Sequence, residues 1–340
     1  MIYLICNNAG LKIDGIGDYT SNLHNAIASR VGDDNVNLFS GDSGHKGRFE
    51  QLTSLVMTKV LLSLYKKIKE GDTVIIEYPF AECNILVLLI LKLIKKRLVK
   101  RNGHILLSLH EYFRTNAIRR FLTRRIVSCV DGVFVTDTAT KAWVAGKYID
   151  KPTYIRTIPS NIFCEGKESV PKDKKLFVFF GLISKTKAFD EMIQAWKLFN
   201  KDKNCRLLIL TSSQCDLSLE ECGVLVIRGA EKDSIADYLA SAGFCVLPII
   251  PCVSSNNATY KSAIGYNCIP IGVFGEEVGD LSAYIDIRDN TVEELQKGLE
   301  RAYSLNDEER RHYYSTLDKR PKPTFEVTAK EYLDVINKFK

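Results

Sequence analysis

The chain has 340 residues, enough for two domains at about 100–200 residues per domain. Hydrophobic residues make up 46% of the chain and charged residues 26%, a balance that excludes an intrinsically disordered protein. The ten cysteines include no Cys-x-x-Cys pair, and no histidine lies at zinc-ligand spacing from a cysteine pair, so we expect reduced, buried thiols and no metal site. The N-terminus lacks the basic segment of a signal peptide, and no apolar run reaches the ~20 residues that span a bilayer, which predicts a cytoplasmic protein.

Positive charge is concentrated in one part of the chain. The net charge is +6, but the segment from Ala81 to Val130 contains eleven basic and two acidic residues, an excess of nine positive charges. The remaining residues therefore carry a net charge of −3. One face of the first half should be strongly basic and should meet an anionic partner.

Strands and helices alternate along the first half. Apolar runs predict strands at 1–6, 36–39, 73–77, 104–109 and 132–135. Amphipathic spacing predicts helices at 19–31, 52–69 and 84–101, and a basic helix between 109 and 132. This alternation is typical of a parallel sheet.

The loop after the first strand contains two glycines, Gly15 and Gly17. Glycines there let the backbone approach a ligand, and the following helix offers unpaired N–H groups to a phosphate or a sugar. A tight turn explains the same pair. A dinucleotide fingerprint would place a third glycine where the chain has Thr20, although Asp42 follows the second strand as a ribose-binding acid would.

His110 and Glu111 follow the strand 104–109 directly. Ligands of open parallel sheets bind at that edge, so His110 is a candidate to donate to developing charge or to relay a proton. The alternative is a buried histidine that is hydrogen-bonded for structural reasons.

A polar segment punctuated by prolines, from Lys151 to Lys175, separates the halves and contains the predicted linker, 158–175. The pattern then restarts, with strands at 176–180, 206–210, 224–227, 244–247 and 269–273 and helices at 189–200, 234–242, 259–266, 292–305 and 324–339. We expect an α/β protein with Rossmann-like domains at 1–157 and 176–322 and a final helical segment at 323–340.

Two loops of the second half suit a nucleotide diphosphate. Gly181 ends a strand, and Lys185 and Lys187 follow it in the loop that enters a helix, where lysine serves as a point charge for phosphate. The alternative is a solvated loop charge. The second loop gathers hydroxyls and amides before another helix, which is also the composition of an N-cap cluster. Its candidate donor-binding residues are Ser254, Ser255, Asn256, Asn257 and Thr259.

Taken in order, these segments resemble GT-B glycosyltransferases, especially those of the family-4 or group-1 type. The run 15–23, Gly-Ile-Gly-Asp-Tyr-Thr-Ser-Asn-Leu, resembles their N-terminal loop and helix, and His110-Glu111 resembles their first-domain histidine motif. The run 158–162 resembles the segment that crosses to the second domain. The run 180–190 resembles the stretch whose basic residue grips the donor diphosphate, and 238–248 with 262–271 resembles the donor half.

The resemblance covers nearly the whole chain. It implies two domains that face each other across a cleft, with the last helix packed back on the first domain. That family usually carries two glutamates in the donor loop, where this chain has Ser254 and Ser262, and an arginine where it has Leu182.

The resemblance also implies a mechanism. Lys187 and Lys185 would stabilise the leaving nucleotide diphosphate, and N–H groups near 256–259 would add to this. Gly15, Gly17 and His110 would face the acceptor and the sugar, with either Asp18 or Glu111 as the base. The donor would be a UDP- or GDP-type sugar, with no further cofactor. No Asp-x-Asp motif is present, so we expect a metal-independent hexosyl- or glycosyltransferase.

The acceptor implied by the resemblance is a glycan or lipid-linked molecule in bacterial surface polysaccharide, for instance lipopolysaccharide, biosynthesis. Three other functions stay open. They are a nucleotide-sugar epimerase, a sugar-nucleotide-binding subunit without catalysis, which would explain the two serines, and, least favoured, a nicotinamide oxidoreductase.

The basic segment suggests peripheral attachment to the inner face of the cytoplasmic membrane. An apolar run, 85–91, precedes basic residues that we assign to an anionic membrane or to the acceptor. These residues are Lys95, Lys96, Arg97, Arg119, Arg120, Arg124 and Arg125. A helix buried against the sheet with a solvated basic end is the alternative. Nucleic acid is excluded as a partner here, because no recognition motif accompanies the charge.

Overall fold

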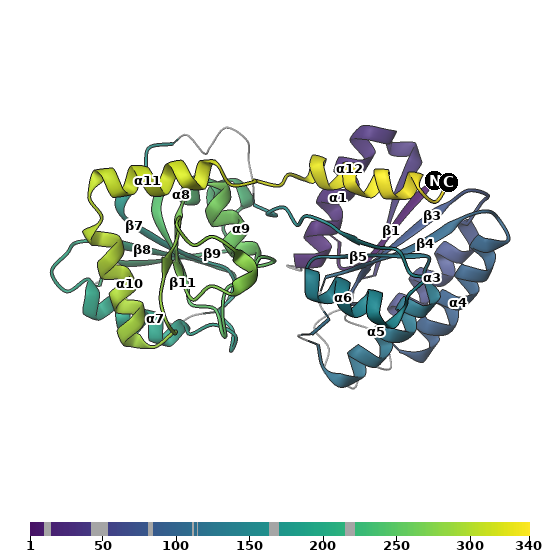
Figure 1. The fold of residues 1–340 in the computed structure, drawn as a ribbon, viewed down its shortest axis with the longest axis horizontal. Helices are drawn as coiled ribbons and strands as arrows, with labels where there is room; N and C mark the ends of the chain where they lie inside the picture. The colour runs from purple at the N-terminus through teal and green to yellow at the C-terminus, as the bar shows by residue number, and fades with distance from the viewer. Residues whose placement is uncertain are drawn as a thin grey trace. The chain divides into compact units, whose positions relative to one another are not determined.

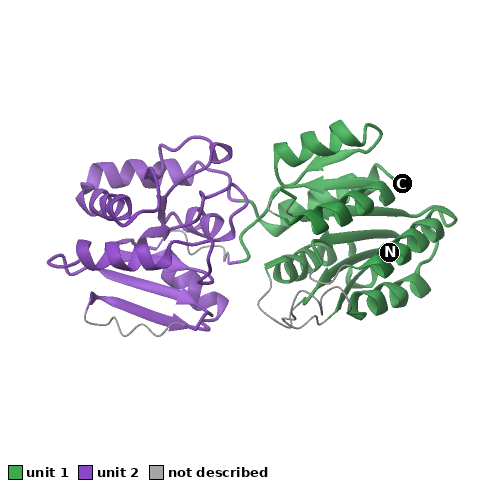
Figure 2. Ribbon diagram, turned by 90° about the horizontal axis from the view of Figure 1, so that it is seen from below, with its two compact units in different colours: residues 1–161, 323–340 green, residues 162–322 purple. Residues whose placement is uncertain are grey.

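We describe the protein from a computed structural model, covering residues 1–9, 15–41, 54–80, 84–110, 112–113, 115–162, 170–214 and 222–340. Glu111, one of the two candidate bases, lies outside the described residues, as does Asp42. The chain divides into two compact units (Figure 2), the first made of residues 1–161 with 323–340 and the second of residues 162–322. The predicted α/β fold is confirmed, because each unit is built around a six-stranded parallel sheet.

The sheet of the first unit has the strand order β2-β1-β3-β4-β5-β6 (Figure 1). Its strands are β1 (Ile2–Asn7), β2 (Val36–Gly41), β3 (Thr73–Tyr78), β4 (His104–Leu109), β5 (Gly132–Val135) and β6 (Thr153–Ile155). Its helices are α1 (Gly15–Val31), α3 (Val56–Lys67), α4 (Ile85–Val99), α5 (Ala117–Cys129), α6 (Thr138–Lys147) and α12 (Phe325–Asn337), with a short 3₁₀ turn, η1 (Asp33–Asn35).

Alternate residues of the strands in the first unit pack on opposite faces of its sheet. In β1, Tyr3 and Ile5 contribute to the core shared with α3, α4 and α5. Leu4 contributes to the core on the other face, which it shares with α1 and α12. Figure 1 shows α12 beside α1, so the end of the chain completes the first unit.

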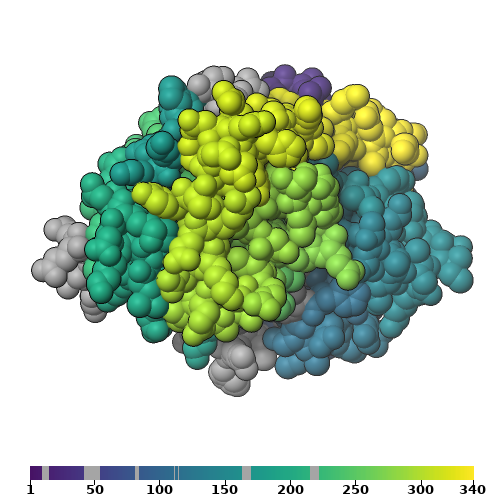
Figure 3. Space-filling model, turned by 60° about the vertical axis from the view of Figure 1, so that its left-hand side comes forward, coloured from purple at the N-terminus to yellow at the C-terminus, as the bar shows by residue number. Residues whose placement is uncertain are grey.

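The sheet of the second unit has the order β12-β11-β10-β7-β8-β9. Its strands are β7 (Asp173–Phe180), β8 (Arg206–Thr211), β9 (Val224–Arg228), β10 (Ala242–Leu247), β11 (Ile269–Gly272) and β12 (Ile285–Asp286). Its helices are α7 (Phe189–Phe199), α8 (Lys232–Ser241), α9 (Ala258–Gly265), α10 (Val292–Ser304) and α11 (Asp307–Asp318), with the 3₁₀ turn η3 (Glu276–Val278). Figure 3 shows α10 and α11 at the surface in yellow-green.

Several elements differ from the sequence prediction. The sequence does not predict the short strands β6 and β12, because two or three residues form no recognisable pattern. It also does not predict the helices α6 and α11, because these helices bury few side chains. Helix α1 begins at Gly15 and not at Tyr19, since glycine is tolerated in a first turn whose N–H groups lack intrahelical partners. The first unit extends to Asn161 and β7 begins at Asp173, so the two units share the described parts of the predicted linker.

In each sheet the first strand of the unit has neighbours on both sides, so the strand order changes direction there. This change creates one switch point in each sheet. In the first unit β1 lies between β2 and β3, and in the second β7 lies between β8 and β10. The connections from neighbouring strands leave to opposite sides at such a point, and ligands of open α/β sheets bind there, at the carboxyl ends of the strands.

Candidate functional site

The switch point of the second unit is formed by the ends of β7 and β10. Gly181 follows β7 with φ +119°, a conformation that strongly favours glycine. A Cβ atom there would lie 2.7 Å from Nζ of Lys187 and 3.3 Å from Oγ1 of Thr259. Lys187 is held in place by a backbone bridge to Ile249, beyond the end of β10. Three residues predicted for the donor site, Gly181, Lys187 and Thr259, therefore lie together.

Lys187 carries a charge that no described residue neutralises. Its ammonium group lies 4.9 Å from the ring centroid of Phe179, and burial lowers its pKa to about 8. Within the described part of the chain it has no hydrogen-bond or ion-pair partner. An isolated desolvated cation is unfavourable, so this position suits an anionic ligand.

The loop before α9 supplies a capped helix N-terminus. The side chain of Asn257 accepts a hydrogen bond from the backbone N–H of Tyr260 at 2.9 Å, and the backbone N–H of Asn257 donates to the carbonyl of Ser254. Thr259 is tied to β7, because its hydroxyl donates to the carbonyl of Phe180 at 3.1 Å. The asparagine therefore acts as a helix cap, as the alternative interpretation proposed, while Thr259 lies beside Lys187.

The other predicted donor residues differ in burial. Lys185 is exposed, and Ser255 and Asn256 are half-buried. Ser262, which stands where the resembled family has a glutamate, is buried and donates to the carbonyl of Ala258 at 3.0 Å.

In the first unit, the predicted glycines open α1. Gly17 packs closely under the end of β1, since a Cβ atom there would lie 2.7 Å from the carbonyl oxygen of Asn8. Gly15 has open space where a Cβ would stand, and its carbonyl accepts a hydrogen bond from Asn161 at 3.1 Å. Asp18 is half-buried in the same turn. Gly17 therefore has a packing role, whereas Gly15 lies at the accessible edge.

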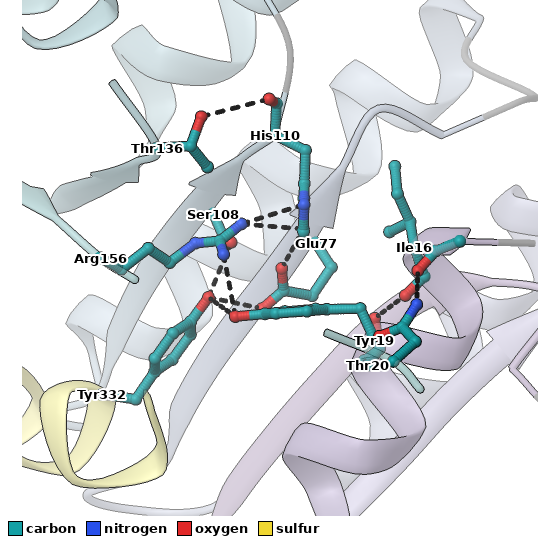
Figure 4. Close-up of polar contacts among 11 residues, drawn as sticks. Ile16, Tyr19, Thr20, Glu77, Ser108, His110, Thr136, Arg156 and Tyr332 are labelled. Atoms are coloured by element: carbon teal, nitrogen blue, oxygen red, sulfur yellow. Dashed lines mark hydrogen bonds and ion pairs between the residues drawn. The ribbon is translucent and has the colours of Figure 1, made fainter. Parts of the chain in front are cut away.

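His110 belongs to a buried polar network at the same edge of the sheet (Figure 4). Its Nε2 lies 2.7 Å from a carboxylate oxygen of Glu77, and one guanidinium nitrogen of Arg156 lies 3.0 Å from both ring nitrogens. Arg156 also donates to the hydroxyl of Tyr19 at 2.9 Å. Tyr332 of α12 donates to the other carboxylate oxygen of Glu77 at 3.0 Å. The network thus joins α1, β3, the ends of β4 and β6, and α12.

The charges inside this network compensate one another. Burial disfavours the ionised form of Glu77, but the hydrogen bond and charge of His110 and the charge of Arg156 hold its pKa below the usual value. Burial likewise opposes the charge of Arg156, but Tyr19, Tyr332 and Glu77 raise its pKa. An ionised carboxylate only accepts hydrogen bonds. Nε2 of His110 is therefore protonated and donates to Glu77.

Sequence analysis missed four participants of this network: Tyr19, Glu77, Arg156 and Tyr332. Glu77 had been read only as the end of an apolar strand, and Arg156 follows a strand that was not predicted. The signal that was available is a carboxylate closing the fully buried run Val74-Ile75-Ile76, because a charge there requires a partner.

The basic residues assigned to a membrane or an acceptor differ in their contacts and in their exposure to solvent. Lys95 forms an ion pair with Asp131, and the guanidinium of Arg97 lies 4.7 Å from the ring centroid of Tyr65. Of the remaining residues, Lys96, Arg124 and Arg125 are exposed, and Arg119 and Arg120 are half-buried.

The described residues also bear on two other kinds of site. They contain no group of three or more His, Cys, Asp or Glu side chains arranged to hold a metal ion. No helix among them combines the length and the apolar character needed to cross a membrane.

Comparisons with known proteins give matches in structure. No protein-family model and no curated protein sequence matches the chain. An α-glucosyltransferase solved with UDP and a 13-mer DNA is 14% identical with a TM-score of 0.65, and 99% of each chain is covered. A glycosyltransferase from Rickettsia africae is 10% identical with a TM-score of 0.64, covering 99% of this chain and 98% of that one. The fold is that of the GT-B glycosyltransferases.

A further match is partial. The GtfA/B complex contains a chain that is 12% identical with a TM-score of 0.53, and the match covers 83% of this chain and 60% of that chain.

The exclusion of nucleic acid as a partner was wrong. The similar α-glucosyltransferase was solved with DNA containing a modified base, a mismatch or an abasic site. A protein of this fold has therefore been solved with DNA.

Proposed function

We propose that the protein transfers a sugar from a UDP-type nucleotide sugar to an acceptor. The observation that carries this proposal is the ammonium of Lys187, which has no partner among the described residues and lies beside Gly181 at the switch point of the second unit. A diphosphate placed there would give Lys187 an anionic partner and would meet the N-terminal end of α9 at Thr259.

The chemistry follows from the charge of the leaving group. As the bond between the sugar and the diphosphate breaks, negative charge grows on the diphosphate, and a fixed cation in a desolvated position stabilises that charge. The structures of similar proteins that contain UDP or UDP-glucose support this choice of donor. We propose no further cofactor and no metal ion for the reaction.

The proposed acceptor side is the first unit. Gly15 and His110 lie at the carboxyl edge of its sheet, and Asp18 and Glu111 remain the two candidate bases. This assignment predicts that His110→Ala lowers turnover more than it lowers donor affinity. A collapse of donor affinity with normal turnover on bound donor would contradict it.

Calorimetric titration with UDP-glucose, UDP-galactose, GDP-mannose and free UDP tests the donor site. Lys187→Met should weaken binding about 10- to 100-fold, since a hydrogen bond to a charged group contributes about 1.5–3 kcal/mol. Lys203→Met is the matched control, because its ammonium also lies 4.9 Å from a phenylalanine ring centroid in the second unit but donates to the carbonyl of Phe199.

The outcomes of this titration separate the competing functions. Equal affinities of the Lys187 and Lys203 variants would remove the donor assignment. Binding that leads to epimerisation without an acceptor would favour an epimerase. Binding without any turnover, with acceptors present, would favour a sugar-nucleotide-binding subunit.

The acceptor that we propose is a glycan or lipid-linked molecule at an anionic membrane surface, as in surface polysaccharide biosynthesis. Helix α4 exposes an apolar stripe in which Ile85 is 72%, Leu89 50% and Leu93 51% exposed. The neighbouring helix α5 exposes Ile118 and Phe121 in its first turns. Both helices begin near the carboxyl edge of the sheet, so the apolar residues gather on the proposed acceptor side.

Basic residues continue the same exposed surface. On α4 and just beyond it, Lys92, Lys96 and Lys100 follow the apolar stripe, and on α5 Arg124 and Arg125 follow Phe121. Apolar side chains followed by a basic region are typical of a surface that lies in the interface of an anionic bilayer. Each basic residue near such a surface contributes about 1 kcal/mol, so several suffice for reversible attachment.

Nucleic acid is the second candidate acceptor. It is favoured by the DNA in the similar α-glucosyltransferase structures and by the same basic residues. The exposed aliphatic residues favour the bilayer over DNA, because phosphate recognition gains nothing from leucine and isoleucine.

One triple variant distinguishes the two acceptors. Ile85→Ser with Leu89→Ser and Phe121→Ser should abolish sedimentation with vesicles that contain 30% phosphatidylglycerol while leaving the binding of a duplex oligonucleotide unchanged. Leu198→Ser is the control, since Leu198 is 58% exposed on α7 of the second unit. Failure of the wild type to bind these vesicles at low salt, together with tight duplex binding, would replace the membrane proposal by the nucleic-acid one.

A further inference from the structure

The last helix of the chain reaches the proposed acceptor site through one side chain. The hydroxyl of Tyr332 donates to a carboxylate oxygen of Glu77 at 3.0 Å and lies 2.8 Å from Oγ of Ser108. The other oxygen of the same carboxylate binds Nε2 of His110 at 2.7 Å. Figure 4 shows this sequence of contacts from α12 to the histidine.

Tyr332 is one of the hydrogen-bond donors that fix the carboxylate of Glu77. Glu77 is fully buried, and the groups that face it are His110, Arg156, Ser108 and the hydroxyls of Tyr19 and Tyr332. His110 and Tyr332 have hydrogen bonds to its two oxygens, and the hydroxyl of Ser108 contributes a further hydrogen bond to the carboxylate. Loss of the Tyr332 hydroxyl would leave Ser108 as the remaining neutral donor and would hold the carboxylate less firmly toward His110.

The ring of Tyr332 has a separate packing role. It stacks on Phe134 with ring centroids 4.2 Å apart and an interplanar angle of 14°. Removal of the hydroxyl alone leaves this stacking intact, so the polar role of the side chain can be tested without removing the ring.

We propose that Tyr332 is a positioning residue for transfer: through Glu77 it fixes the orientation and the protonated nitrogen of His110. This inference rests on the proposed function, and it assigns to the C-terminal helix a part in the acceptor site. Thr157 and Glu331 support the arrangement, because the carboxylate of Glu331 accepts hydrogen bonds from the backbone N–H and the hydroxyl of Thr157, next to Arg156. The helix is thus tied to the segment that carries the second charged partner of His110.

Steady-state kinetics of Tyr332→Phe test the role in turnover. We expect kcat to fall about tenfold, which corresponds to about 1.4 kcal/mol, with the donor KM changed less than about twofold. The acid limb of the kcat profile should move to higher pH, because Glu77 loses a donor that favours its ionised form and is protonated more easily. Tyr148→Phe is the matched control, since its hydroxyl donates to the carbonyl of Arg124 at 2.9 Å in the same unit but lies outside the network.

Imidazole ¹⁵N NMR gives a readout that does not depend on activity. The wild type should show His110 protonated at Nε2, assigned by comparison with His110→Ala, and Tyr332→Phe should show mixed tautomers. Ser108→Ala should cause a smaller change in the same direction, and it tests the inference if Tyr332→Phe does not fold.

Identical kinetics, acid limbs and ¹⁵N shifts for Tyr332→Phe and Tyr148→Phe would overturn the inference and leave the proposed function intact. Absence of transfer by the wild type would instead remove the proposed function, and with it the role of Tyr332 in turnover.

Discussion

The two units differ in whether their buried charged side chains have partners. In the first unit, Glu77 and Arg156 are both buried, and each has partners within the network around His110. In the second unit, the Lys187 ammonium is desolvated without an anion or a hydrogen-bond acceptor among the described residues. A buried charge with partners is tolerated within the fold, whereas one without them is a candidate position for a ligand that would supply the missing partner.

A second lysine of the second unit, Lys172, has a lowered pKa but also has hydrogen-bond acceptors. Burial lowers the pKa of Lys172 to about 8, as it does for Lys187. The ammonium of Lys172, however, donates to the backbone carbonyls of Leu239, Ala240 and Tyr266. A lowered pKa alone therefore does not identify a ligand site, and the presence or absence of acceptors decides which lysine belongs to one.

The largest expected effect is the loss of Arg156. Arg156→Met should lower the free energy of unfolding of the first unit by about 3–5 kcal/mol, because the buried Glu77 would lose one of the two cations that compensate its charge. Urea unfolding in a Trp196→Phe background measures it, since Trp143 then reports the first unit alone. Arg206→Met is the control, an exposed partner of Asp173 expected to change stability by less than about 1 kcal/mol. Equal losses for the two variants would contradict the comparison.

The two buried lysines should respond to substitution with opposite signs. Lys187→Met should raise the stability of the ligand-free second unit at pH 7, by at most about 3 kcal/mol, because it removes a desolvated charge. Lys172→Met should lower stability, since three buried carbonyls lose their donor. Thermal unfolding in a Trp143→Phe background, followed by Trp196, compares them. A loss of stability in both variants would show that Lys187 is a structural lysine.

The predicted donor glycines of the two units should also differ in the effect of substitution by alanine. Gly181→Ala should cost about 1–3 kcal/mol, because φ is +119° and the new Cβ would approach Nζ of Lys187, and it should weaken donor binding as well. Gly15→Ala meets no atom within 4 Å and should change stability by less than about 1 kcal/mol. Denaturant midpoints and donor titrations measure both effects. Normal donor affinity in Gly181→Ala would separate this glycine from the site.

The smallest expected effect is the pH dependence of donor binding. The pKa of Lys187 is about 8 in the ligand-free protein, and a bound diphosphate raises it, so binding takes up a proton once the pH exceeds that value. Donor affinity should fall about threefold between pH 7.5 and 8.5, and Lys187→Arg should lack this fall because arginine stays charged. The stability of the ligand-free protein changes with pH in the opposite direction to donor affinity. In the unfolded chain Lys187 keeps its proton up to about pH 10.5, so the free energy of unfolding rises between about pH 8 and 10.5. A pH-independent affinity of the wild type would remove Lys187 from the donor contact.

The sequence by itself determined the alternation of strands and helices and most residues of the proposed donor loop. Buried runs such as Phe177-Val178-Phe179 are apolar because both faces of a parallel strand are covered, so their pattern is local. Gly181 and Lys187 are separated by only six positions, and their roles as a strand end and a loop cation follow from the neighbouring residues. The resemblance to GT-B glycosyltransferases rested on such local segments and on their order.

Only the tertiary structure decided how charges are paired. Glu77, Arg156 and Tyr332 are far apart in the chain, and the sheet order and the return of α12 to the first unit bring them together at His110. The apolar residues of α4 divide in the same way, because Leu91 is buried against the sheet while Leu89 is exposed. A local pattern reports the surroundings of each residue on its own element, but desolvation and pairing depend on groups from other elements, which is why Lys187 and Lys172 differ only in the folded protein.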